Sequence, residues 1–272
     1  MKLGIPFWLG NLRTLDFFIK RTSCDFIELD METIPKHVIG RLSSKLQAKG
    51  IEVAFHGSWI AASLLFGLQK ELQKSAIKVL KEQFKLATRL KGAYFIVHLD
   101  SAMEGIFRLK RERQILLNSI ISSIKKAKRV RGLKKCATAF LIENVSNIFL
   151  GKRSVIKRVL EETNSKLCID IGHAAKHEFR RGKGMDEIVE AIYKWIKYFK
   201  HDIFAAHLHN FYVEGNVMYD HVINGLLDLE AICMELARTD CKYVMLEVIR
   251  DVKTRKIASL LNRLKEIKTR LA

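Results

Sequence analysis

Ionisable side chains of two kinds, imidazole and carboxylate, end six successive apolar runs of this sequence. They are His56, His98, Glu143, Asp170, His207 and Glu247. Burying several such groups together is costly unless they are paired or hold a metal ion. Mixed imidazole and carboxylate ligands suit zinc or manganese, and a shared carboxylate can bridge two ions. The pattern therefore predicts a metal site, provided that the fold brings the six ends together.

The apolar runs are part of a regular alternation along the chain. Eight short runs rich in strand-forming residues occupy 2–6, 25–30, 51–56, 93–100, 138–145, 166–171, 204–209 and 242–248. Longer amphipathic segments separate them, for example 71–90, 112–130, 186–199 and 229–238. Eight strand–helix repeats in 272 residues predict the α/β class and a single (β/α)8 TIM barrel. The carboxyl ends of the strands would then meet at one mouth, where active sites form.

Composition excludes several other classes of protein. The hydrophobic fraction of 49% and charged fraction of 28% are ordinary for a globular protein. No apolar run approaches the roughly 18 residues of a membrane span, and no signal peptide is evident, so we expect a cytoplasmic protein without a membrane partner. An open doubly wound sheet is disfavoured because no GxGxxG turn follows the first strand. Without a linker or compositional break, we expect residues 1–272 to form one domain.

Two motifs carry a family resemblance. Cys168-Ile-Asp-Ile-Gly-His-Ala174 and His207-Leu-His-Asn210 resemble segments of the xylose isomerase-like TIM-barrel superfamily. That superfamily includes endonuclease IV-type apurinic/apyrimidinic endonucleases and sugar or sugar-phosphate isomerases and epimerases. The resemblance covers nearly the whole chain. It implies metal ligands at His56, His98, Glu143, Asp170, His173, His207, His221 and Glu247.

The endonuclease branch implies two or three zinc ions held by these ligands. His56, His98 and Glu143 would hold the first. Glu143 would also bridge to a second ion, held with Asp170, His207 and Glu247, and His173 and His221 would help to hold a third. The match departs at Tyr219, where this branch has an aspartate. An aspartate stands one residue later, at Asp220, so the third ion depends on whether Asp220 reaches it.

The favoured function is metal-dependent hydrolysis of damaged duplex DNA at abasic sites, by a monomer, with Glu143 and Glu247 as catalytic residues. The net charge of +19 favours a polyanionic partner. Basic clusters follow the fourth and sixth runs, the first at 108–113 and the second at Arg180, Arg181 and Lys183. The second cluster is predicted to bind substrate. Trp59 matches an aromatic residue of the endonuclease branch that stacks at the damaged site.

The same residues support two alternatives. A sugar or sugar-phosphate isomerase or epimerase needs only Glu143, Asp170, His207 and Glu247, with one Zn or Mn ion polarising the substrate and two glutamates exchanging its proton. A non-enzymatic barrel with a relict site is supported only by Tyr219. His209 alternates with His207 along the seventh run, so we expect it to face away and to support or pack rather than bind metal.

Overall fold

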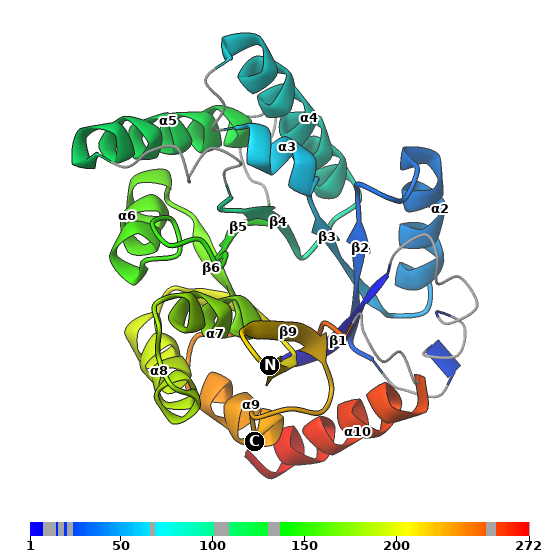
Figure 1. Cartoon of the computed structure of the whole chain (residues 1–272). Coiled ribbons are helices and arrows are strands. Elements are labelled where there is room, and N and C mark those ends of the chain that lie inside the picture. Colours follow the sequence, from blue (N-terminus) through cyan, green and yellow to red (C-terminus); the bar gives the residue numbers. More distant parts are fainter. Residues whose placement is uncertain are drawn as a thin grey trace. The chain divides into compact units, whose positions relative to one another are not determined.

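Among the described residues of the computed structural model, parallel strands are interspersed with helices (Figure 1). The structure describes residues 1–7, 15, 19–20, 24–65, 69–100, 109–129, 137–248 and 254–271. The parallel strands are β1 (Lys2–Phe7), β2 (Phe26–Asp30), β3 (Glu52–His56), β4 (Tyr94–His98), β5 (Ala139–Glu143), β6 (Lys166–Asp170), β7 (Ile203–Leu208) and β10 (Tyr243–Leu246). They close in the order β1-β10-β7-β6-β5-β4-β3-β2. The predicted (β/α)8 TIM barrel is confirmed.

Helices follow the strands, as the amphipathic segments predict. They are α2 (Lys36–Gln47), α3 (Trp59–Leu64), α4 (Lys70–Arg89), α5 (Lys110–Lys128), α6 (Arg153–Thr163), α7 (Ile171–Arg180), α8 (Met185–Tyr198), α9 (Leu229–Ala237) and α10 (Thr254–Leu271). Among the described residues, no helix combines the length and the apolar character that crossing a bilayer requires.

The chain divides into two compact units, and residues 29–166 form one of them. Its strands β3, β4 and β5 pair in parallel, and the pairing places His98 of β4 directly opposite Glu143 of β5. Between the strands and α4, Phe84, Phe95 and Phe140 form an aromatic cluster with ring centroids 5.1–5.6 Å apart. The aromatic cluster supports the strands from which the polar ends project.

The second unit comprises residues 1–28 and 167–272. In it β7 pairs with both β6 and β10, so that His207 lies opposite Asp170 on one side and Met245 on the other. Strand β10 pairs in turn with β1. The strands carry almost unbroken apolar runs because both of their faces are buried. The expectation that residues 1–272 form one domain stays a prediction.

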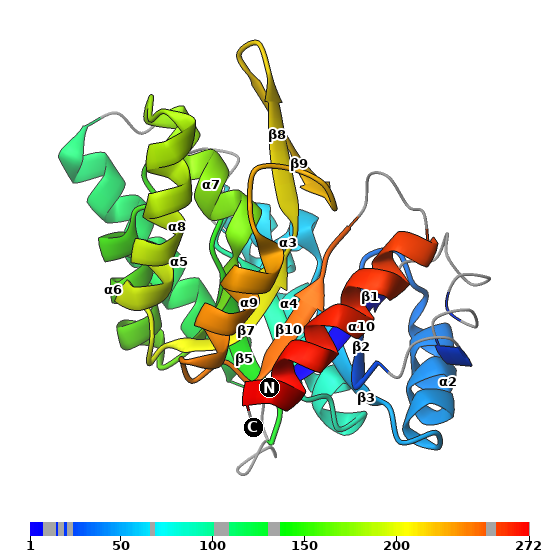
Figure 2. The ribbon, with the colours of Figure 1, turned by 90° about the horizontal axis from the view of Figure 1, so that it is seen from below.

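An antiparallel hairpin leaves the end of β7 and was not predicted from the sequence (Figure 2). Its strands are β8 (Asn210–Glu214) and β9 (Val217–Val222). The side chain of Asn210 ties the base of the hairpin to the following loop, donating to the carbonyl of Leu227 at 2.8 Å and accepting its backbone N–H at 2.9 Å. The hairpin returns the chain to the strand ends, and it carries His221.

Candidate metal centre

Three side chains converge at the ends of β3, β4 and β5. Oε2 of Glu143 lies 3.3 Å from Nε2 of His56 and 3.0 Å from Nε2 of His98. The two imidazole nitrogens lie 3.2 Å from each other. All three atoms belong to groups that bind metal ions, and Glu143 is 1% exposed. The structure thus brings together the three residues that were predicted to hold one ion.

A hydrogen bond of His56 determines which of its two ring nitrogens carries the proton. Nδ1 of His56 lies 3.0 Å from the carbonyl oxygen of Gly57. Because a carbonyl oxygen only accepts, Nδ1 carries the proton, and in the neutral ring Nε2 presents a lone pair toward the carboxylate. In that neutral form, the lone pair on Nε2 of His56 and the Glu143 carboxylate are both available to one cation.

Three predicted ligands meet likewise in the second unit. Nδ1 of His207 lies 3.2 Å from Oε2 of Glu247 and 3.9 Å from Oδ2 of Asp170. Its other nitrogen, Nε2, lies 3.3 Å from Oε2 of Glu28. A carboxylate that holds the outer nitrogen of a metal-binding histidine orients the ring and makes it a better ligand. Glu28 therefore supports His207 in the way that Gly57 supports His56.

His221 reaches this group from the hairpin. Its Nε2 lies 3.5 Å from Oε2 of Glu247, and its Nδ1 lies 3.4 Å from Oδ1 of Asp220. Burial opposes a charge on the ring, but Asp220 and Glu247 together raise the pKa of His221 to about 10. Without a metal ion, His221 is therefore a cation at neutral pH.

The carboxylates of this group are held in their charged form. Burial would raise the pKa of Glu247, but the His207 and His221 rings hold it well below its ordinary value. Burial likewise opposes the charge on Asp170, whose pKa is lowered by His173 and His209. Ionised carboxylates buried beside imidazoles are the donors that a divalent cation requires.

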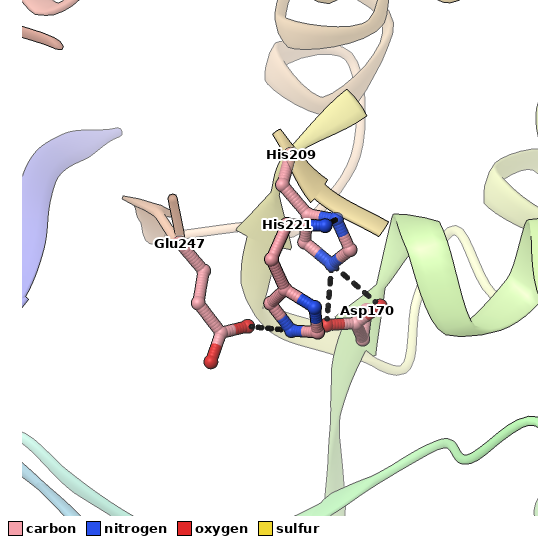
Figure 3. Close-up of side chains that lie close together, drawn as sticks. All are labelled: Asp170, His209, His221 and Glu247. Carbon is pink, nitrogen blue, oxygen red and sulfur yellow. Dashed lines mark hydrogen bonds and ion pairs between the residues drawn. The ribbon is translucent and has the colours of Figure 1, made fainter. Parts of the chain in front are cut away.

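His209 also belongs to this group, contrary to the expectation that it faces away from the site (Figure 3). Its Nε2 lies 3.1 Å from both carboxylate oxygens of Asp170, and its ring stacks on His221 at 4.1 Å between centroids. The expectation assumed that strand alternation continues through residue 209. Strand β7 ends at Leu208, so alternation no longer determines the direction of the next side chain.

Asp220, next to Tyr219 in the hairpin, contacts two cationic groups. Its carboxylate accepts from Nζ of Lys176 at 3.0 Å and pairs with His221, which together hold its pKa low despite burial. Tyr219 instead stacks on Tyr212, with centroids 5.0 Å apart. Asp220 thus contacts both Lys176 and His221. Its replacement of the aspartate expected at Tyr219 stays a prediction.

His173 lies beside the group but outside the clustered ligand atoms of the described residues. Its backbone N–H caps α7 by donating to Oδ1 of Asp170, and its ring centroid lies 5.7 Å from that of His221. Glu143 belongs to residues 29–166, whereas Asp170, His207 and Glu247 belong to the second unit. The bridging role of Glu143 and the ligand role of His173 therefore stay predictions.

The predicted substrate-binding residues occupy defined positions. The indole of Trp59 is 52% exposed, and its Nε1 donates to Asp100 at 2.9 Å, which holds the ring in place. Arg181 and Lys183, in the turn after α7, both pair with the buried Glu178, at 3.3 and 2.6 Å. Arg180 is the last residue of α7. Their binding to substrate stays a prediction, and Arg108 of the other basic cluster lies outside the described residues.

Glu28 is the supporting residue that sequence reasoning missed. It stands in the middle of β2, in Phe-Ile-Glu-Leu-Asp, and is 2% exposed. A carboxylate inside a fully buried strand needs a partner, so its presence in that apolar run was a usable signal. Glu28 lies inside its strand, whereas most of the predicted ligands lie at or next to strand ends.

No family model and no curated protein matches this sequence. Solved structures do resemble it along its whole length. A D-tagatose 3-epimerase-like protein has a TM-score of 0.70 at 18% identity, covering 100% of both chains. The IOLI protein with a bound zinc atom has a TM-score of 0.71 at 13% identity, covering 98% of each chain. A xylose isomerase domain protein from Planctomyces limnophilus has a TM-score of 0.68 at 12% identity, covering 99% of this chain and 98% of that chain. At such identities the likeness establishes the fold.

Proposed function

From its fold, which is that of the xylose isomerase-like TIM barrels, we propose that this chain is a divalent-metal-dependent phosphodiesterase that cleaves duplex DNA at abasic sites. The observation that carries the proposal is the convergence of His56 and His98 on Glu143. An isomerase that works with one ion needs only the Glu143, Asp170, His207 and Glu247 set. The two additional imidazoles support a second metal position, as phosphodiester cleavage by a multi-metal site requires.

The donor sets of the two units define which residues would hold the ions. His56, His98 and Glu143 form one set, and Asp170, His207, His221 and Glu247 form the other. Imidazole and carboxylate donors favour Zn2+, with Mn2+ as the alternative. When bound, such ions would lower the pKa of water and offset the negative charge of the phosphate.

The side chains would divide the work of hydrolysis. A water oxygen attacks phosphorus, its proton passes to the Glu143 carboxylate, and the bond to the leaving sugar oxygen breaks, with solvent supplying the proton to that oxygen. Glu247, held ionised by its imidazole neighbours, maintains the ligand set of the second unit. Trp59 offers an exposed, anchored ring on which a base can stack beside the lesion. Arg180, Arg181 and Lys183 would contact the DNA backbone.

The second candidate is a sugar or sugar-phosphate isomerase or epimerase. Two observations favour it. A D-tagatose 3-epimerase-like protein is among the structural neighbours. In addition, Asp220 is engaged by Lys176, so the third ligand set of the endonuclease branch lacks its aspartate. In this alternative Glu143 and Glu247 would exchange the proton at a sugar carbon.

His98→Ala separates the two candidates, because only the nuclease depends on that ligand. We expect the substitution to lower the cleavage rate of an abasic duplex at least about 100-fold, as loss of a metal ligand from the reacting site does. Cleavage is measured by gel electrophoresis of labelled duplex, and ketose epimerisation is measured on the same preparations.

The matched control is His201→Ala, since His201 is 77% exposed and pairs with the exposed Asp240 at the surface. It should cleave as fast as the wild type. The epimerase would replace the nuclease as the proposed function under two results together. The wild type would epimerise a ketose without cleaving the abasic duplex, and His98→Ala would keep the wild-type rate of epimerisation.

A further inference from the structure

The histidines of the donor sets in the two units differ in which ring nitrogen the protein engages. In His56, His207 and His221 the nitrogen remote from the clustered carboxylate lies near an oxygen, which is Gly57 O, Glu28 Oε2 and Asp220 Oδ1 respectively. An oxygen acceptor places the proton on that remote nitrogen. In the neutral ring, the nitrogen that faces the carboxylate is then left with a lone pair for a metal ion.

His209 has the opposite arrangement. Its remote nitrogen, Nδ1, accepts the backbone N–H of His221 at 2.9 Å. An N–H donor cannot approach a protonated nitrogen at that distance, so Nδ1 is unprotonated, although the carbonyl of Asn210 lies 3.3 Å away. The proton of the ring must be on Nε2, which then donates to Asp170 at 3.1 Å.

Two backbone features build this arrangement. His221 has a φ of 61°, a left-handed conformation that residues other than glycine rarely adopt, and it directs its N–H at the His209 ring. Gly172, two residues after Asp170, makes room for the same ring, since a Cβ at this position would overlap His209. The backbone of the hairpin at His221 and the start of α7 at Gly172 thus both accommodate the His209 ring.

We propose that His209 is a positioning residue: it holds Asp170 in ligand geometry through an Nε2–H donor and does not itself bind the metal. This inference rests on the metal site of the proposed function and applies to a nuclease and an epimerase alike. It also links the hairpin to the site, because the proton on Nε2 is fixed by the backbone of β9.

Two substitutions of His209 separate its two hydrogen bonds. His209→Gln places an amide N–H where Nε2 stood and keeps the donor to Asp170. His209→Asn places an oxygen where Nδ1 stood and keeps only the acceptor for His221. We expect Zn2+ affinity, measured by competition with a chromophoric chelator, to fall about 10–100-fold in His209→Asn and to stay within about threefold of wild type in His209→Gln. Equal, large losses in both variants would show a direct ligand and overturn the proposal.

A second measurement needs no variant. Long-range 1H–15N correlation spectra of the metal-free and Zn2+-loaded wild type report which ring nitrogen of His209 carries the proton. The proposal predicts the Nε2–H form in both states, whereas an Nδ1–H form in the loaded protein would contradict it. His201→Asn serves as a control for affinity. If the wild type bound no Zn2+, the proposed function would fail, and the metal-free spectrum would still test the proton position.

Discussion

At the scale of residues, the orientation of a metal-binding imidazole depends on the oxygen atom that contacts its other ring nitrogen. The carboxylate of Glu28 is buried, 2% exposed, and its partner His207 is fully buried. Burying a carboxylate is costly unless it has a hydrogen-bonding or charged partner. The His207 ring is that partner for Glu28, which explains a glutamate inside a buried strand. The supporting atoms are as informative about the site as the ligands themselves.

Removing the acceptor behind His207 should weaken metal binding without removing a ligand. We expect Glu28→Leu to lower Zn2+ affinity about 10–100-fold, because the ring loses its orientation and basicity. Glu28→Gln, whose amide oxygen still accepts, should keep most of the affinity. Chelator competition measures both, with the exposed Glu190→Gln as control. Wild-type affinity in Glu28→Leu would contradict the supporting role.

His221 should make metal binding depend on pH. Its pKa is raised to about 10 in the metal-free protein, above the ordinary 6.5, so its ion pairs stabilise the fold fully below pH 6.5 and are lost as pH rises through about 10. An ion that binds Nε2 must displace this proton. Affinity for Zn2+ should therefore rise between pH 7 and 9, by up to about tenfold per pH unit.

Calorimetry in buffers of different ionisation enthalpy counts the protons released on binding. We expect the wild type to release about one more proton at pH 7 than His221→Gln does. Equal proton release from the two proteins would show that His221 is not displaced by the metal.

At the scale of elements, the parallel strands were predictable and the hairpin was missed. A strand buried on both faces has to be a continuous apolar run, and eight such runs marked the eight barrel strands. The hairpin had a different signal: Gly215-Asn216 between two runs rich in aromatic and β-branched residues, a pattern typical of a two-residue turn. Without the hairpin, the alternation of side chains along β7 is expected to continue to His209, one residue beyond the end of the strand.

Geometry within the site was not available from the sequence for a related reason. Asp220 directly follows Tyr219, the position left open by the missing aspartate, but its role depends on Lys176 of α7, 44 residues away in the chain. Only the packing of the hairpin against that helix decides between a ligand and an orienting group. The sequence tells which chemical groups are present, whereas tertiary contacts decide which groups they pair with.

One cation joins two helices in the unit of residues 29–166. Nζ of Lys128, at the end of α5, donates to the carbonyls of Thr163 and Asn164 and to Oγ of Ser165, at 2.6–3.0 Å. The two carbonyls end α6 and would otherwise lack intrahelical partners, whereas Oγ of Ser165 also accepts from Oγ1 of Thr163. Burial lowers the pKa of Lys128 to about 8.

Lys128→Met should therefore destabilise the protein by about 1–3 kcal/mol, since it leaves partly buried acceptors without their donor. Urea unfolding measures the change. The exposed Lys125→Met, on the same helix, should have almost no effect. Equal free energies of unfolding for the two variants would contradict the role of Lys128 as the cap of α6.

At the scale of the whole molecule, net charge predicts how DNA binding responds to salt. The chain carries 48 Lys and Arg against 29 Asp and Glu, a net charge of +19. Contacts to phosphates release counterions, so the logarithm of the affinity for duplex should fall linearly with the logarithm of salt concentration, with a slope of about −0.9 per phosphate contacted. Fluorescence anisotropy with intact and abasic duplexes measures it. A flat response would argue against a DNA partner.

The most direct measurement is cleavage of a labelled duplex that contains one abasic site, by Zn2+-loaded wild type and by Glu247→Ala. We expect incision on the 5′ side of the lesion by the wild type and by the exposed control Glu190→Ala, and none by Glu247→Ala. Intact duplex should remain uncut. A wild type that binds its metal ions and leaves the abasic duplex intact would contradict the proposed phosphodiesterase activity. A Glu247→Ala variant that cuts at the wild-type rate would contradict the proposed role of Glu247.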